Sequence, residues 1–105
     1  MTTMDRAEVI ARLRAHEAEL RAAGVEKLCV FGSVARGDQT EGSDVDVAIR
    51  LSPEAANGGF AYFGRLDGLA RRLGDILGNP VDVVIEPIRR ERLKRAVEKD
   101  ALLAF

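Results

Sequence analysis

The sequence predicts an α/β or α+β sandwich, with helices packed on one face of a small sheet. Two observations support this fold class. Short apolar segments of the strand type alternate with segments whose apolar residues recur at helical spacing, in the order α-β-(α)-β-α-β-α. The chain has 105 residues, of which 47% are hydrophobic. This is the size of one domain with a single core, so residues 1–105 are expected to form one domain.

The first predicted helix covers residues 5–23. Asp5 can cap its N-terminus, with Glu8 three residues later as in a capping box, and Gly24 supplies a stop at its C-terminus. The apolar residues that recur at helical spacing along it are Val9, Ile10, Leu13 and Leu20. This stripe predicts the buried face of the helix.

A buried strand is predicted over residues 27–31, where an apolar run ends at Gly32. Residues 33–37 then begin a short helix or turn. The segment 38–43 is polar and is expected to be a loop before the next strand.

The second half of the chain predicts a helix, a strand and a helix. The segment 52–54, Ser-Pro-Glu, starts the first of them with a cap, a proline at the first helical position and an early acid. This helix runs to about Leu77, although Asn-Gly-Gly at 57–59 weakens it, so two segments are possible. The remaining elements are a stop at 78–80, a strand over 81–85, a helix over 89–99 and an apolar tail over 101–105. The tail either folds onto the sheet or docks a partner.

Charge and composition exclude several classes of function. The formal net charge is −1, so direct nucleic-acid binding is not expected. No apolar run approaches the roughly 18 residues of a membrane span, so we expect no membrane association. The single cysteine, Cys29, excludes an intramolecular disulfide and fits a reducing cytoplasm.

Asp44 and Asp46 form a candidate metal site. Residues 44–50 alternate as in a strand, which puts both carboxylates on one face, with Cβ atoms about 6.5–7 Å apart. Two such acids repel each other, so they need cations, protons or solvent between them. Because Mg²⁺ prefers carboxylate and phosphate oxygens, the pair could hold one or two Mg²⁺ ions against a triphosphate. The alternative is an exposed strand face that carries two solvated acids.

Gly32 and Ser33 form a candidate phosphate-binding turn. A helix that begins directly after a strand offers free backbone N–H groups and the positive end of its dipole to a phosphate. Gly32 allows close approach of the backbone, and the Ser33 hydroxyl adds a donor. The Arg36 guanidinium could make bidentate contacts with the β- or γ-phosphate. The alternative is an ordinary tight turn with a surface arginine.

Asp82 is the third candidate. It interrupts an otherwise apolar predicted strand, where an acid either faces a polar site or is penalised on burial. If this strand lies beside the one that carries Asp44 and Asp46, three carboxylates converge, which suits two-metal catalysis. Asp82 would then bind a metal ion or act as the base. The alternative is an acid on an edge strand that faces water.

Taken together, these motifs resemble the minimal nucleotidyltransferases (MNT), the smallest members of the DNA polymerase β-like superfamily. Gly-Ser-Val-Ala-Arg-Gly at 32–37, followed by Ser-Asp-Val-Asp-Val at 43–47, is similar to the family pattern GSxARG…SDxDL. Asp82 matches the third acid of that pattern, and Val47 stands where many relatives have leucine. The resemblance covers nearly the whole chain, including the segment 98–101 in the closing helix.

The resemblance implies a polymerase β-like nucleotidyltransferase fold, in which a small mixed sheet carries the acids. It also implies transfer of a nucleoside monophosphate, usually AMP from ATP, with Mg²⁺ as the cofactor and two ions expected. The catalytic and metal-binding residues would be Asp44, Asp46 and Asp82. The nucleotide-binding and phosphate-binding residues would be Gly32, Ser33 and Arg36.

The family resemblance further implies a role as an antitoxin. Many such proteins are paired with an all-helical HEPN-type RNase toxin, and the better understood ones adenylylate a tyrosine on it. We therefore expect the antitoxin of a type VII-like HEPN/MNT pair, which acts on its partner toxin in a hetero-oligomer. The chain length agrees, because 105 residues leave little surface for a second lobe that would hold an acceptor.

Two alternatives remain open at this point. The first is a non-catalytic antitoxin that neutralises its toxin by binding alone. The second is a stand-alone transferase for a small molecule such as an aminoglycoside. The second alternative needs an acceptor pocket that the sequence does not reveal.

Overall fold

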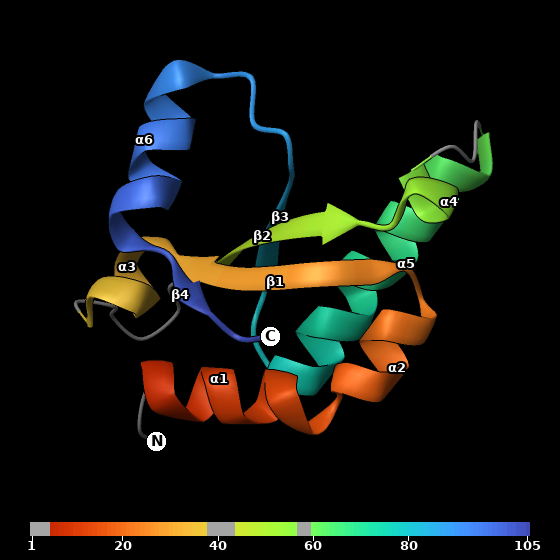
Figure 1. Ribbon diagram of the computed structural model, residues 1–105. Helices are drawn as coiled ribbons and strands as arrows, with labels where there is room; N and C mark the ends of the chain where they lie inside the picture. The colour runs from red at the N-terminus through yellow and green to blue at the C-terminus, as the bar shows by residue number, and fades with distance from the viewer. Residues whose placement is uncertain (1–4, 38–43, 57–59) are drawn as a thin grey trace.

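The computed structural model describes residues 5–37, 44–56 and 60–105, and these residues form a mixed four-stranded sheet in the order β3-β2-β1-β4. The strands are β1 (Val25–Phe31), β2 (Val45–Leu51), β3 (Val81–Ile85) and β4 (Leu102–Leu103). β1 pairs antiparallel with both β2 and β4, whereas β2 and β3 are parallel (Figure 1). The predicted α+β fold with a small mixed sheet is confirmed.

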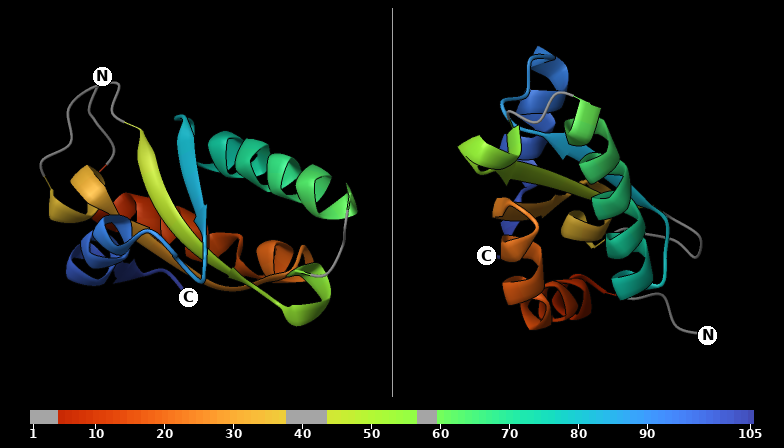
Figure 2. Two further views of the ribbon diagram at one scale, coloured as in Figure 1. Left: turned by 90° about the horizontal axis from the view of Figure 1, so that it is seen from above. Right: turned by 90° about the vertical axis from the view of Figure 1, so that its right-hand side faces the viewer.

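Three helices cover one face of the sheet: α1 (Arg6–Ala15), α2 (Glu17–Ala22) and α5 (Phe60–Leu77). Figures 1 and 2 show α1 and α2 running beneath the sheet, with α5 packed beside them. The Asp5 cap is confirmed, since the Glu8 backbone N–H donates to Asp5 Oδ1 at 2.9 Å.

The helix predicted over residues 5–23 is two helices in the structure. α1 ends and α2 begins at His16, whose φ of −110° and ψ of 16° lie outside the helical region. No glycine or proline stands at this break, so the sequence carries no local signal for it.

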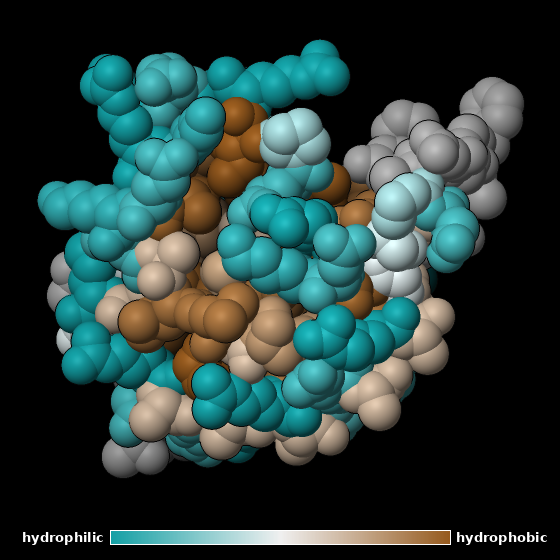
Figure 3. Space-filling model, viewed as in Figure 1, coloured by the Kyte–Doolittle hydropathy of each residue, from teal (hydrophilic) through white to brown (hydrophobic). Residues whose placement is uncertain are grey.

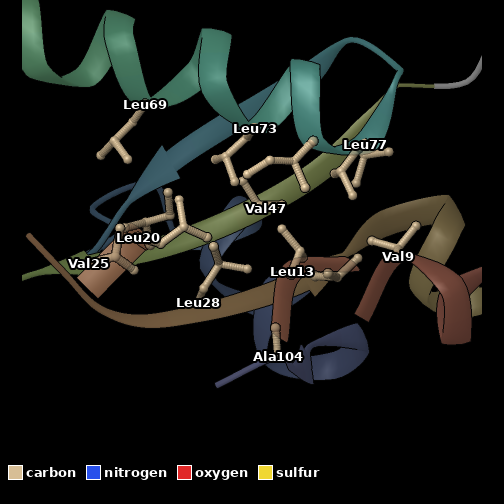
Figure 4. Packing of buried hydrophobic residues seen from close by; sticks show 14 of the residues in the cluster. Val9, Leu13, Leu20, Val25, Leu28, Val47, Leu69, Leu73, Leu77 and Ala104 are labelled. Carbon is tan, nitrogen blue, oxygen red and sulfur yellow. The ribbon is translucent and has the colours of Figure 1, made fainter. Parts of the chain in front are cut away.

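The core lies between these helices and the sheet. Side chains from α1, β1, β2 and α5 point toward one another in Figure 4. Those of Leu13, Leu28, Val47 and Leu73 have no exposed surface. Burying a side chain of this size is worth about 1.5–3 kcal/mol, so this layer fixes the positions of β1 and β2.

The final helix, α6 (Glu91–Asp100), packs on the opposite face of the sheet. Val97 contacts Phe31 of β1 and Ala48 of β2, two strand residues that point away from the main core. The prediction that the helices pack on one face of the sheet is correct for α1, α2 and α5. It is wrong for α6, which packs on the second face because that face also carries apolar residues. In Figure 3, apolar atoms of this face remain visible between α6 and the segment that leads into it.

The remaining elements agree with the predictions. The short helix α3 (Gly32–Arg36) follows β1, and the helices α4 (Pro53–Ala56) and α5 lie on either side of 57–59. The predicted loop at 38–43 lies outside the described residues, as do 57–59. The apolar tail folds onto the sheet as β4, and Ala104 is 1% exposed. No helix in the described ranges has the length and apolar character of a membrane span.

Candidate active site

The strand pairing brings two of the predicted acids together. Asp46 of β2 and Asp82 of β3 are register partners in a parallel ladder, so their side chains leave the sheet on the same face. The three-acid site predicted from the sequence required the strand with Asp82 to lie beside the strand with Asp46, and it does. Asp44 immediately precedes β2 and is exposed. The three acids therefore occupy one end of the sheet, on the face that α6 covers in part.

The glycine turn meets the same end of the sheet. Phe31, the last residue of β1, is the register partner of Asp46, and Gly32 follows it with a φ of +77°. A Cβ atom added at Gly32 would lie 3.1 Å from Cγ of Asp46 and would overlap its Oδ2 atom. Only glycine fits here, because the position requires both a left-handed backbone and the absence of a side chain.

The acids act on one another electrostatically. Burial raises the pKa of the Asp46 carboxyl above its ordinary value, and the nearby carboxylates of Asp82 and Asp44 raise that pKa further. The positive charge of Arg36 acts in the opposite direction and lowers it. Three acids and one arginine thus share a single electrostatic environment.

These carboxylates fit Mg²⁺ by their chemistry. Within the part of the chain that the structure describes, no three His, Cys, Asp or Glu side chains are gathered closely enough to hold a metal ion by themselves. Mg²⁺ is commonly bound through one or two carboxylates, several waters and the phosphates of a substrate. The crowding of negative charge around Asp46 suits a cation that binds together with a triphosphate.

The predicted phosphate-binding residues lie on α3, beside the acids. Ser33 stands in its first turn and is partly buried, and Arg36 is its last residue. The Arg36 guanidinium donates from Nη1 to Oδ2 of Asp100 at 3.0 Å. Sequence reasoning did not assign Asp100 to the site. The one local signal is an acid at the C-terminal end of a helix, where a basic residue is favoured.

Similarity to known proteins agrees with this geometry. A family model described as a nucleotidyltransferase domain matches residues 13–104. A candidate protein adenylyltransferase of Methanocaldococcus jannaschii, MJ0128, is 33% identical over 81 residues, which are 74% of this chain and 74% of the relative.

Solved structures share the fold. A candidate minimal nucleotidyltransferase superposes with a TM-score of 0.74 at 29% identity, covering 97% of this chain and 98% of that one. A chain from the complex of a tri-AMPylated Shewanella oneidensis HEPN toxin with an MNT antitoxin has a TM-score of 0.61. That chain is 17% identical, and the superposition covers 92% of this chain and 71% of the other, which is a likeness of fold.

Proposed function

The chain belongs to the nucleotidyltransferase domain family, and on this premise we propose that it transfers AMP from ATP to a hydroxyl group of a partner protein, with Mg²⁺ as the cofactor. One observation carries the proposal. Asp46 lies between its register partner Asp82 and the glycine turn at Gly32, so acids and a phosphate-binding backbone meet at one point. A candidate protein adenylyltransferase among the relatives supports a protein as the acceptor.

The residues of this chain bind ATP, the donor of the AMP group, together with Mg²⁺. The backbone at Gly32, the Ser33 hydroxyl and the Arg36 guanidinium bind the phosphates of ATP. Mg²⁺, held by Asp44, Asp46 and Asp82 together with phosphate oxygens, would lower the pKa of the attacking hydroxyl and neutralise the leaving pyrophosphate.

The transfer step is a displacement at the α-phosphorus of ATP. The acceptor oxygen forms a bond to the α-phosphorus, and the bond from that phosphorus to the oxygen bridging to the β-phosphate breaks. Pyrophosphate leaves with the electron pair of that bond. The acceptor proton passes to water, or to the exposed Asp82 carboxylate where that acid serves as the base instead of as a metal ligand.

For the acceptor, we propose a tyrosine of a HEPN-type RNase toxin, bound by this chain as its antitoxin. The fold supports this choice, because it is shared with a chain from the complex of an AMPylated HEPN toxin with an MNT antitoxin.

The experiment compares two labels on ATP. The chain is incubated with Mg²⁺, the HEPN partner, and ATP labelled on either the α- or the γ-phosphate. We expect label on the partner from α-labelled ATP alone, because the nucleotidyl group moves and pyrophosphate leaves. Transfer of the γ-label would indicate a kinase, and no transfer of either label would reject the proposal.

A double variant separates catalysis from simple binding. Asp44→Asn/Asp46→Asn is expected to keep its partner in a pull-down but to lose label transfer and neutralisation of the toxin in cells. If the double variant still neutralises, the chain acts by binding alone. Transfer to an aminoglycoside in the absence of any partner would instead favour a small-molecule transferase.

A further inference from the structure

We propose that Asp100, the last residue of α6, is a positioning residue that holds Arg36 where its guanidinium can bind the triphosphate. The inference rests on the proposed function and extends its site to the C-terminal helix. It starts from one contact, in which Arg36 Nη1 donates to Asp100 Oδ2 at 3.0 Å across a sequence separation of 64 residues.

The two partners are buried unequally. The Asp100 side chain is 11% exposed, whereas the Arg36 side chain is 47% exposed. A carboxylate that is mostly removed from water needs a compensating partner, and Arg36 provides one. A guanidinium carries five N–H donors in a planar fork, so Arg36 can contact Asp100 and phosphate oxygens at the same time.

The stability of α6 does not explain an acid at this position. The C-terminal end of a helix carries partial negative charge, so an aspartate there is unfavourable and a basic residue is favoured. Lys99, the preceding residue, follows that preference. Asp100 therefore meets two costs, from the helix dipole and from burial, that its contact with Arg36 offsets.

Both partners are anchored on β1. Asp100 is followed by β4, in which Leu102 is the register partner of Val30. Val30 lies two residues before Gly32, where α3 begins, and Arg36 ends that helix. Both side chains therefore lie near the C-terminal end of β1. At this position the positive charge of Arg36 lowers the pKa of Asp46.

The test measures the dissociation constant of Mg²⁺-ATP by calorimetry for the full chain. Asp100→Ala is expected to weaken binding about five- to tenfold, as the loss of an ordered charge-assisted contact would. Asp100→Asn should weaken it less, and Asp100→Glu should restore part of the loss. Glu91→Ala is the matched control, because it removes an exposed acid and its ion pair with Arg95 from the other end of α6.

A double variant distinguishes positioning from a general structural role. In the Arg36→Ala background, Asp100→Ala should cause no further loss of ATP binding, since there is no guanidinium left to position. Additive losses, unchanged binding or tighter binding in Asp100→Ala would each overturn the inference. Circular dichroism verifies folding, and Asp100→Asn, which keeps the shape of the side chain, takes over if Asp100→Ala does not fold.

Binding of Mg²⁺-ATP by the wild-type chain distinguishes a failure of the proposed function from a failure of the role of Asp100. If it does not bind Mg²⁺-ATP, the proposed function fails and this inference falls with it. If it binds Mg²⁺-ATP and the Asp100 variants bind equally well, only the inference is overturned.

Discussion

Gly32 and Asp46 are packed so closely that no side chain fits between them. A Cβ atom at Gly32 would stand 3.1 Å from Cγ of Asp46, and the Gly32 φ of +77° already disfavours any other residue. The turn that would bind phosphates and the acid that would bind metal are therefore in direct contact. A change at either residue moves both parts of the site.

The first prediction concerns Gly32→Ala. We expect at least a hundredfold loss of transfer activity, since displacement of the Asp46 carboxylate by even about 1 Å has effects of this size. We also expect a loss of unfolding free energy of about 1–3 kcal/mol from the left-handed backbone together with the overlap. Chemical denaturation measures the second quantity.

Two glycine variants serve as controls that separate the cost of the left-handed backbone from the cost of the overlap with Asp46. Gly78→Ala places alanine at a φ of +70° with no atom within 4 Å, so it reports the backbone cost alone. Gly68→Ala lies within α5 in open space and should stabilise the protein by about 0.5–1 kcal/mol. If Gly32→Ala costs no more than Gly78→Ala and keeps its activity, the close packing against Asp46 is unimportant.

The second prediction concerns the charge of Asp46. The folded state raises the pKa of this carboxyl, so its ionised form costs folding free energy at pH values above the folded-state pKa. Asp46→Asn should therefore stabilise the metal-free protein at pH 7, by no more than about 1 kcal/mol because solvent screens a partly exposed group. The advantage should shrink as the pH falls through the folded-state pKa, where the wild-type carboxyl takes up its proton.

Thermal unfolding in the presence of a chelator measures this effect at several pH values. Asp67→Asn is the control, since Asp67 lies on α5 with a side chain that is 69% exposed. A lower melting temperature for Asp46→Asn than for wild type at pH 7 would contradict the electrostatic description of the site. Activity should be lost in Asp46→Asn whatever its stability.

The third prediction concerns the C-terminal segment 102–105, which contains β4 and, directly after it, Ala104. Ala104 is 1% exposed, its N–H donates to the Leu28 carbonyl at 2.8 Å, and its carbonyl accepts from Arg14 Nε at 2.7 Å. Ala104→Asp should cost about 3 kcal/mol or more, because it buries an unpaired charge. Leu103→Asp should stay within about 0.5 kcal/mol, since Leu103 is 55% exposed. Equal losses of unfolding free energy in the two variants would show that β4 does not pack as described.

Local patterns were sufficient to predict most elements. The strand over 81–85 has the predicted limits, because Gly78 and Pro80 stop the preceding helix and the apolar run that follows is short. Asp82 is a predicted site residue for the same local reason, since an acid is unexpected in such a run. The glycine at the end of β1 was likewise visible as a break between two patterns.

Long-range relationships could not be predicted in this way. Sequence periodicity does not say which strands pair, so the register of Asp46 with Asp82 needed the sheet itself. The packing of α6 on the second face depends on Phe31 and Ala48, which come to lie together because β1 pairs with β2 and Phe31 is the register partner of Asp46. The contact of Arg36 with Asp100 joins residues 64 positions apart, and the acid at the end of α6 does not by itself indicate which residue it contacts.

The proposed nucleotidyl transfer to a partner protein depends on the acids at the end of β2 and β3. Intact mass spectrometry of the HEPN partner, purified from cells that also produce this chain, tests it most directly. With the wild-type chain, the partner should gain the mass of one or more AMP groups. With Asp44→Asn/Asp46→Asn, the partner should keep its unmodified mass. An unmodified partner with the wild-type chain, or equal modification by both chains, would show that these acids do not transfer AMP to the partner.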